Sequence, residues 1–156
     1  MKTLVVGIGN PILGDDGVGF HVARELAGEI KDENVDVKYT SIDGLNLLEL
    51  VVGYDKVIIV DAIMTQDGEV GEIYMLRPEN ISRTMQYTTS PHNVNLATAI
   101  EIGQRYLTEQ MPGEVVIFAV GIQGVTEFTE EMTKKVKEAV PEAANLILEE
   151  IDPNKE

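Results

Sequence analysis

Three runs of β-branched and other apolar residues constrain the fold of this chain more than any other feature of its sequence. They read TLVVGIG (3–9), KVIIVDAI (56–63) and EVVIFAVGI (114–122). Nearly continuous apolar runs of this length are typical of strands that are covered on both faces, as in a parallel sheet between layers of helices. A fourth run, VDVKYTSI (35–42), is more polar and is also expected to form a strand.

Helical patterns lie between the predicted strands. A helix is expected after the first run and a short one after residues 35–42, because apolar residues recur there at helical spacings. A third helix is expected over residues 91–107, and a C-terminal helix that starts after Thr129 and is interrupted or restarted at Pro141. The apolar positions assigned to the first three helices are Phe20, Ala23, Ala27 and Ile30, then Leu47, Leu48 and Val51, then Val94, Ala97, Ile100 and Leu107.

The segment GEIYMLR (71–77) breaks the alternation of strands and helices. It follows the third strand after about eight residues, whereas a parallel crossover needs about a dozen or more. We therefore predict that it is antiparallel and lies at an edge. The predicted fold is an α/β three-layer sandwich. It has a five-stranded, mostly parallel twisted sheet with one antiparallel strand and helices on both faces, and residues 1–156 form a single domain.

Charge and composition exclude several classes of function. The chain has 12 Lys and Arg against 27 Asp and Glu, a net charge of −15, so a basic surface for nucleic acid is not expected. There are no cysteines, which excludes disulfides, a cysteine nucleophile and thiolate metal ligands. The apolar runs are too short for membrane insertion, and the N-terminus does not resemble a secretory signal, so a cytoplasmic protein is expected.

The stretch GIGNPILGDDGVG (7–19) resembles a phosphate-binding glycine loop at first sight. The third glycine of the dinucleotide pattern is replaced by Ile12, however, and no lysine of the Walker type follows. Asp15 and Asp16 would repel a phosphate group. Nucleotide binding therefore stays a minor alternative, in which Asp43 would contact the ribose.

The same loop suits a different ligand. It leaves the carboxyl end of the first strand, where open α/β sheets bind ligands, and its two acids open the following helix. Asp15 and Asp16 cannot both serve as simple helix caps, so one carboxylate is expected to point into the crevice. Asp61 interrupts the third apolar run, where a carboxylate needs a hydrogen-bonding, charged or metal partner. A structural Asp that caps the next loop is an equal alternative for Asp61.

Histidine supplies the third member of the candidate site. Ser90 and Pro91 are typical of a helix start and place His92 in the first turn, where the helix dipole favours the neutral ring that binds metals. His21 is expected to be structural or to donate a hydrogen bond to a metal ligand. Asp16, Asp61 and His92 form a set of two carboxylates and one imidazole that suits nickel or zinc, with coordination positions left open. An aspartic dyad of Asp16 and Asp61 is a less favoured alternative.

With these residues identified, the chain resembles the hydrogenase maturation proteases. The resemblance is carried by GIGNPILGDDGVG near the start, VDA in the third strand (60–62) and SPH before the helix at 91–107, in this order and at similar distances. It covers nearly the whole chain.

The resemblance implies a small cytoplasmic α/β endopeptidase that binds the large-subunit precursor of a nickel–iron hydrogenase after nickel insertion. Such a protein would remove a short C-terminal extension. The family's metal ligands carry over to Asp16, Asp61 and His92, and the nickel would be supplied by the substrate, with zinc or cadmium as substitutes. The resemblance identifies no catalytic residue beyond these ligands. The rival hypothesis is a non-catalytic metal-binding chaperone that docks on the same precursor.

Overall fold

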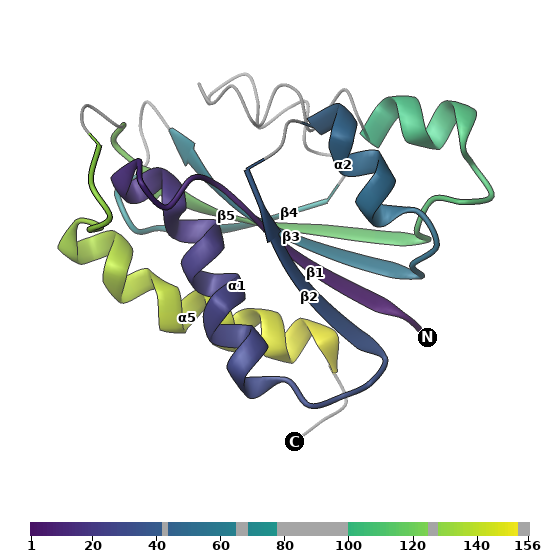
Figure 1. The fold of residues 1–156 in the computed structure, drawn as a ribbon, viewed down its shortest axis with the longest axis horizontal. Coiled ribbons are helices and arrows are strands. Elements are labelled where there is room, and N and C mark those ends of the chain that lie inside the picture. The colour runs from purple at the N-terminus through teal and green to yellow at the C-terminus, as the bar shows by residue number, and fades with distance from the viewer. Residues whose placement is uncertain (42–43, 65–68, 78–99, 125–127, 153–156) are drawn as a thin grey trace.

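The apolar runs form the centre of a five-stranded sheet whose strands lie in the order β2-β1-β3-β5-β4 (Figure 1). The structure is a computed structural model and describes residues 1–41, 44–64, 69–77, 100–124 and 128–152. The strands are β1 (Thr3–Ile8), β2 (Val35–Thr40), β3 (Lys56–Met64), β4 (Ile73–Leu76) and β5 (Glu114–Ile122). The helices are the 3-10 helix η1 (Gly14–Gly17), α1 (Val18–Glu29), α2 (Gly44–Val51) and α5 (Lys134–Ile151), and residues 100–106 are also helical.

Strand directions agree with the prediction from the sequence. β1 is parallel to both β2 and β3, and β3 is parallel to β5. β4 is antiparallel to β5 and lies at one edge of the sheet. The short connection between β3 and β4 explains this direction, because it cannot return the chain to the amino ends of the strands, where a parallel strand would start. The predicted α/β fold, with one antiparallel strand in a mostly parallel sheet, is confirmed.

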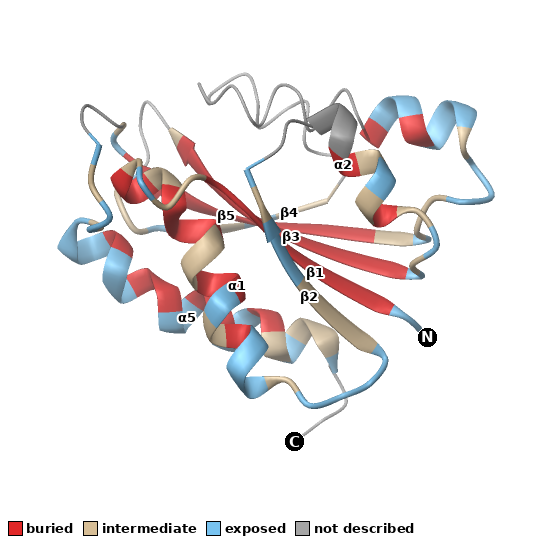
Figure 2. Cartoon of the chain, in the orientation of Figure 1, coloured by how far each residue is buried: buried red, intermediate tan, exposed pale blue. Residues whose placement is uncertain are grey.

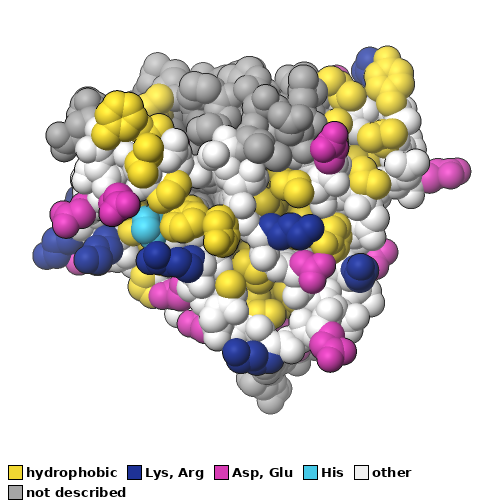
Figure 3. All heavy atoms as spheres, in the orientation of Figure 1, with side chains coloured by type: hydrophobic (Ala, Val, Ile, Leu, Met, Phe, Trp, Pro, Cys, Tyr) yellow, Lys and Arg dark blue, Asp and Glu magenta, His cyan; other side chains and the backbone are white. Residues whose placement is uncertain are grey.

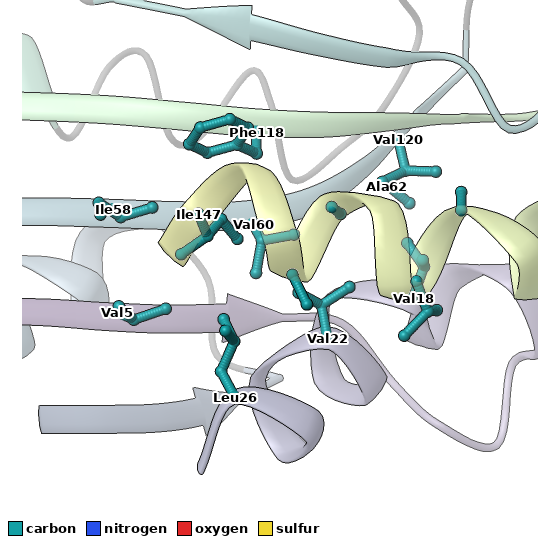
Figure 4. Close-up of a cluster of buried hydrophobic side chains, with 14 of the residues drawn as sticks. Val5, Val18, Val22, Leu26, Ile58, Val60, Ala62, Phe118, Val120 and Ile147 are labelled. Atoms are coloured by element: carbon teal, nitrogen blue, oxygen red, sulfur yellow. The ribbon is translucent and has the colours of Figure 1, made fainter. Parts of the chain in front are cut away.

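Helices cover both faces of the sheet. The central strands are buried along most of their length (Figure 2). Their residues alternate between two buried clusters, as the two-residue period of a strand requires. On one face, residues such as Val60 and Phe118 pack against α1 and α5 (Figure 4). On the other, residues such as Ile59 pack against α2 and the helical residues 100–106. Both faces of β3 and β5 are therefore buried, which is why their sequences are continuously apolar.

The buried face of α1 differs from the predicted one. The residues of α1 that are buried are Val18, Gly19, Val22, Ala23 and Leu26. Of the predicted positions, Ala23 is buried, Phe20 is half-buried and Ala27 is exposed, while Ile30 follows the helix as its C-cap. The prediction was wrong because it followed Phe20 and Ala27, whereas Val18, Val22 and Leu26, which also recur every four residues, form the buried face. Leu47 and Val51 of α2 are buried, as is Ile100.

The C-terminal helix also starts later than predicted. α5 begins at Lys134, with Thr133 as its N-cap, and runs through Pro141 without interruption. Thr129 lies before the helix and pairs with the glycine loop: its N–H donates to the carbonyl of Ile12 at 2.8 Å. The exposed Pro141 costs one hydrogen bond, which the buried residues on either side of it offset.

A cluster of charged side chains lies at the amino ends of β3 and β5. Lys56 is 4% exposed. Its Nζ lies 3.3 Å from a carboxylate oxygen of Glu114 and 3.2 Å from one of Glu150, and it donates to the Glu150 carbonyl at 2.6 Å. Arg77 approaches the same two carboxylates at 3.6 Å. The buried ammonium is therefore paired and hydrogen-bonded, as a buried charge must be.

Within the ranges that the structure describes, no helix is both long enough and apolar enough to cross a membrane.

Candidate active site

Asp61 is a carboxylate enclosed within the sheet. It is 0% exposed and lies in β3 one residue beyond the last pair between β1 and β3, which is Gly7 with Val60. Its Oδ1 accepts a hydrogen bond from the N–H of Ala62 at 2.8 Å. Strand alternation places Asp61 on the face of Val57 and Ile59, which α2 and residues 100–106 cover. The sheet thus fixes this carboxylate near its carboxyl edge, where α/β proteins bind ligands.

The glycines of the loop let its backbone approach the sheet closely. A Cβ at Gly19 would lie 2.4 Å from the carbonyl oxygens of both Ile8 and Val60, so any side chain there would push the start of α1 away from β1 and β3. Gly9 has a φ of 149°, and a Cβ there would lie 2.1 Å from the carbonyl oxygen of Asp16. As a result, η1 lies against β3, the strand that carries Asp61.

The two consecutive acids of η1 point to different partners. Asp16 is half-buried, and its Oδ2 accepts a hydrogen bond from the N–H of Asn10 at 3.1 Å. Asp15 is 7% exposed and binds Thr133, the N-cap of α5. The Thr133 N–H donates to Oδ1 at 2.7 Å and its hydroxyl donates to Oδ2 at 2.9 Å. Neither acid is the N-cap of α1, since that residue is Gly17.

The third predicted ligand, His92, lies outside the described residues, as does Asp43. Among the described residues, no three His, Cys, Asp or Glu side chains are grouped closely enough to hold a metal ion. The structure therefore brings the loop of Asp16 to the strand of Asp61, and the complete set of three ligands stays a prediction.

His21, for which the sequence predicts a structural role or a hydrogen bond to a metal ligand, lies on α1. Its Nε2 atom is buried and has no hydrogen-bond partner in the described part of the chain. Burial, with a smaller contribution from the charge of Arg24, lowers the pKa of this imidazole below its ordinary value of 6.5. The ring lines a groove of about 410 Å³ beside Met132 and Lys137, between α1 and α5.

Thr133 is the site residue that sequence reasoning missed. The signal was the threonine directly before the run KKVKEAV, which is the usual composition of a helix N-cap followed by a helical segment. Thr129 presented the same signal four residues earlier. Only the pairing of Thr129 with the glycine loop separates the two, and that pairing joins segments far apart in the sequence.

Comparison with known proteins gives consistent matches. A family model described as hydrogenase maturation protease matches residues 20–150. A protein of Methanocaldococcus jannaschii, provisionally named a hydrogenase maturation protease, is 32% identical over 155 residues, which is 95% of both chains. The Hydrogenase 3 maturation protease of Escherichia coli strain K12 is 30% identical, over 90% of this chain and 85% of its own.

A solved structure gives the same result for the fold. The hydrogenase maturating endopeptidase HybD from E. coli superposes with a TM-score of 0.81 over 97% of this chain and 92% of its own, at 24% identity. The family model covers most of the chain, and the relatives align with it over most of their lengths. The chain therefore belongs to the hydrogenase maturation protease family and is a hydrolase that cuts peptide bonds.

Proposed function

We propose that this endopeptidase removes the C-terminal extension from the large-subunit precursor of a nickel–iron hydrogenase after nickel has been inserted. In this proposal Asp16, Asp61 and His92 bind the nickel that the precursor carries, and zinc or cadmium can take its place. Family membership supports a hydrogenase large-subunit precursor as the partner. A cytoplasmic site of action belongs to the same proposal.

The observation that carries the proposal is the complete burial of Asp61 inside β3. Burying a carboxylate costs several kcal/mol unless it is hydrogen-bonded, paired with a charge or bound to a metal, so a fold keeps one there for a reason. The loop of Asp16 lies against the same strand. Asp61 faces the layer that contains residues 100–106, and His92 is predicted in the first turn of that helix. Two carboxylates and an imidazole suit a borderline divalent cation.

Each residue has a distinct task in this proposal. Asp61 is held inside a paired strand, so it supplies a fixed point for the ion. Asp16 is half-buried on η1 and approaches from the rim, where a large partner can reach it. A divalent ion polarises a nearby carbonyl oxygen and lowers the barrier to attack on it. The contribution of the chain is to hold the ion and the scissile peptide together in one orientation, which lowers the entropic cost of the reaction.

Processing of a purified precursor tests the proposal. Nickel-loaded and nickel-free precursor are each incubated with the protein, and the intact mass of the large subunit is followed with time. We expect mass loss at the C-terminus of the nickel-loaded form only. Asp16→Ala and His92→Ala should each slow this reaction at least about 100-fold, which is the upper range for removal of a group that supports a metal site. Asp32→Ala is the matched control, since this exposed carboxylate accepts a hydrogen bond from the N–H of Asn34 in the loop before β2.

The contrary results separate the parts of the proposal. Equal processing of nickel-free precursor would discard metal recognition. Normal rates in both variants would discard the ligand assignment. Stable binding of the nickel-loaded precursor without any mass loss would favour the chaperone hypothesis.

A further inference from the structure

The side chain of Asp15 joins two segments that lie 118 residues apart in the sequence. Both of its oxygens are occupied by donors of Thr133, at 2.7 and 2.9 Å. Hydrogen bonds to a carboxylate are stronger than those between neutral groups, and this carboxylate is 7% exposed, so water competes little for it. Asp15 therefore fixes η1 to the start of α5.

Thr133 is a firm anchor. It is the N-cap of an 18-residue helix whose apolar face, including Val136 and Ile147, is buried against the sheet and α1. Its hydroxyl makes no capping bond to its own helix and donates to Asp15. The carboxylate lies at the amino end of α5, where the helix dipole favours a negative charge.

The backbone reinforces the same connection. The N–H of Gly14 donates to the carbonyl of Thr129 at 2.8 Å, and the N–H of Thr129 donates to the carbonyl of Ile12 at 2.8 Å. Two backbone bonds and the Asp15 carboxylate therefore tie the loop to residues 129–133. Asp16 follows directly, and its Oδ2 accepts from the N–H of Asn10 within the same loop. Any rotation of η1 that released Asp15 would also displace Asp16.

We propose that Asp15 is a positioning residue: it holds η1 against α5 so that the carboxylate of Asp16 keeps a fixed direction at the carboxyl edge of the sheet. The reaction-dependent half of this inference rests on the function proposed above, and the loop-holding half does not. Thr133 is the partner through which Asp15 acts.

The first measurement needs neither metal nor precursor. Amide hydrogen exchange is followed at Asn10, Leu13 and Asp16, whose N–H groups are bonded within the loop. We expect Asp15→Ala to speed exchange at these amides at least about tenfold, because the bonds of the loop open more often without the anchor. Thr133→Val removes only the hydroxyl and should give a smaller increase. Thr133→Ser keeps both donors and should exchange like the unsubstituted protein.

The second measurement is the processing of nickel-loaded precursor. A misplaced Asp16 should lower kcat about 10- to 100-fold in Asp15→Ala and leave KM within about threefold. Ile147→Val is the control for lost stability alone: it shortens a side chain on α5 that is 0% exposed and should change neither the loop amides nor kcat.

Unchanged exchange at the loop amides in Asp15→Ala overturns the inference, and so does faster exchange with an unaltered kcat. Failure of the unsubstituted protein to process any precursor overturns the proposed function instead, and the exchange rates then decide whether Asp15 holds the loop.

Discussion

His21 is a half-buried ionisable side chain, and its protonation is coupled to the stability of the fold. Its Nε2 atom has no hydrogen-bond partner in the described ranges, and burial followed by the Arg24 charge lowers its pKa. A proton therefore binds the unfolded chain more readily than the folded one. The stability that this residue contributes is fully present above pH 6.5, its ordinary pKa, and is lost as the pH falls through the lower pKa of the folded state.

We expect His21→Gln to make the free energy of unfolding depend less on pH below pH 7. Glutamine does not titrate, so the free energy of unfolding should fall less between pH 7 and pH 5 in the variant than in the unsubstituted protein. Urea denaturation at half-unit pH intervals measures both curves. Carboxylates titrate alike in the two proteins, so two parallel curves would show that the imidazole contributes nothing to the slope.

The sequence predicts part of the candidate site at this scale. It identifies Asp16 and Asp61 as acids at the carboxyl edge because each follows or interrupts a predicted strand. It assigns Asp16 to the ligand set but gives no physical reason why Asp15 turns away from the edge. That choice depends on Thr133, a partner that becomes a neighbour only after α5 packs on the sheet.

Helix α1 packs closely on the sheet at Gly19, where a side chain would not fit. Gly28, in the same helix, has open space around it and allows a matched comparison. Gly19→Ala would place a Cβ 2.4 Å from two backbone oxygens, whereas a Cβ at Gly28 meets nothing within 4 Å. We expect Gly19→Ala to cost about 3 kcal/mol or more, because the helix must move away from the strands. Gly28→Ala should stabilise the protein by about 0.5–1 kcal/mol by restricting the unfolded chain.

Urea denaturation of the two variants measures both changes in the free energy of unfolding. The chemical change is the same in one helix, so helix propensity alone predicts equal effects. Equal effects would therefore show that the close approach of α1 to β1 and β3 is unimportant for stability.

The proline inside α5 lowers the stability of the fold. Pro141 lies inside the helix and is exposed, so it lacks one helical hydrogen bond and gains little from burial. Pro141→Ala should raise the free energy of unfolding by about 2 kcal/mol, which is the helix-interior cost of about 3 kcal/mol less the entropy that proline removes from the unfolded chain. Glu142→Ala, at the next exposed position, should stay within about 0.5 kcal/mol of the unsubstituted protein. A loss of stability in Pro141→Ala would mean that the ring makes contacts worth more than the missing bond.

The presence of the helices could be predicted from the sequence, but the buried face of α1 and the first residue of α5 could not. The periodic apolar residues predict α1 and α2, but α1 carries two overlapping apolar patterns, and only the one with Val18, Val22 and Leu26 is buried. The start of α5 was misplaced because two threonines offered the same capping signal, and the tertiary pairing of Thr129 with the loop decided between them.

Charge acts on the molecule as a whole. Acidic and basic side chains are interspersed over the surface shown in Figure 3. The net charge of the chain is nevertheless −15, because it has 27 Asp and Glu and only 12 Lys and Arg. Self-repulsion at this net charge destabilises the folded state, and salt screens it. Raising sodium chloride from 10 to 300 mM should therefore stabilise the protein by about 1 kcal/mol, or about 2–4 °C in Tm.

Differential scanning calorimetry measures the change in Tm, and choline chloride at equal ionic strength controls for sodium binding. A fall in Tm with salt would show that attractive pairs, such as those of Lys56, outweigh the repulsion.

The architecture was predictable at this scale because it depends on long, regular signals. Continuous apolar runs indicate strands buried on both faces, and the length of one connection sets the direction of β4. The complete set of three ligands was not settled in the same way, because it depends on residues brought together from three separate segments, and His92 lies outside the described residues.

The cluster of Lys56, Glu114 and Glu150 lies at the opposite ends of the strands from Asp61. The paired charges and the proposed metal ligand thus lie toward opposite ends of one sheet. Substitutions at the carboxyl edge of the sheet can therefore change which partner is recognised without disturbing the ion pairs of Lys56. Substrate specificity can diverge in this way while the fold is retained.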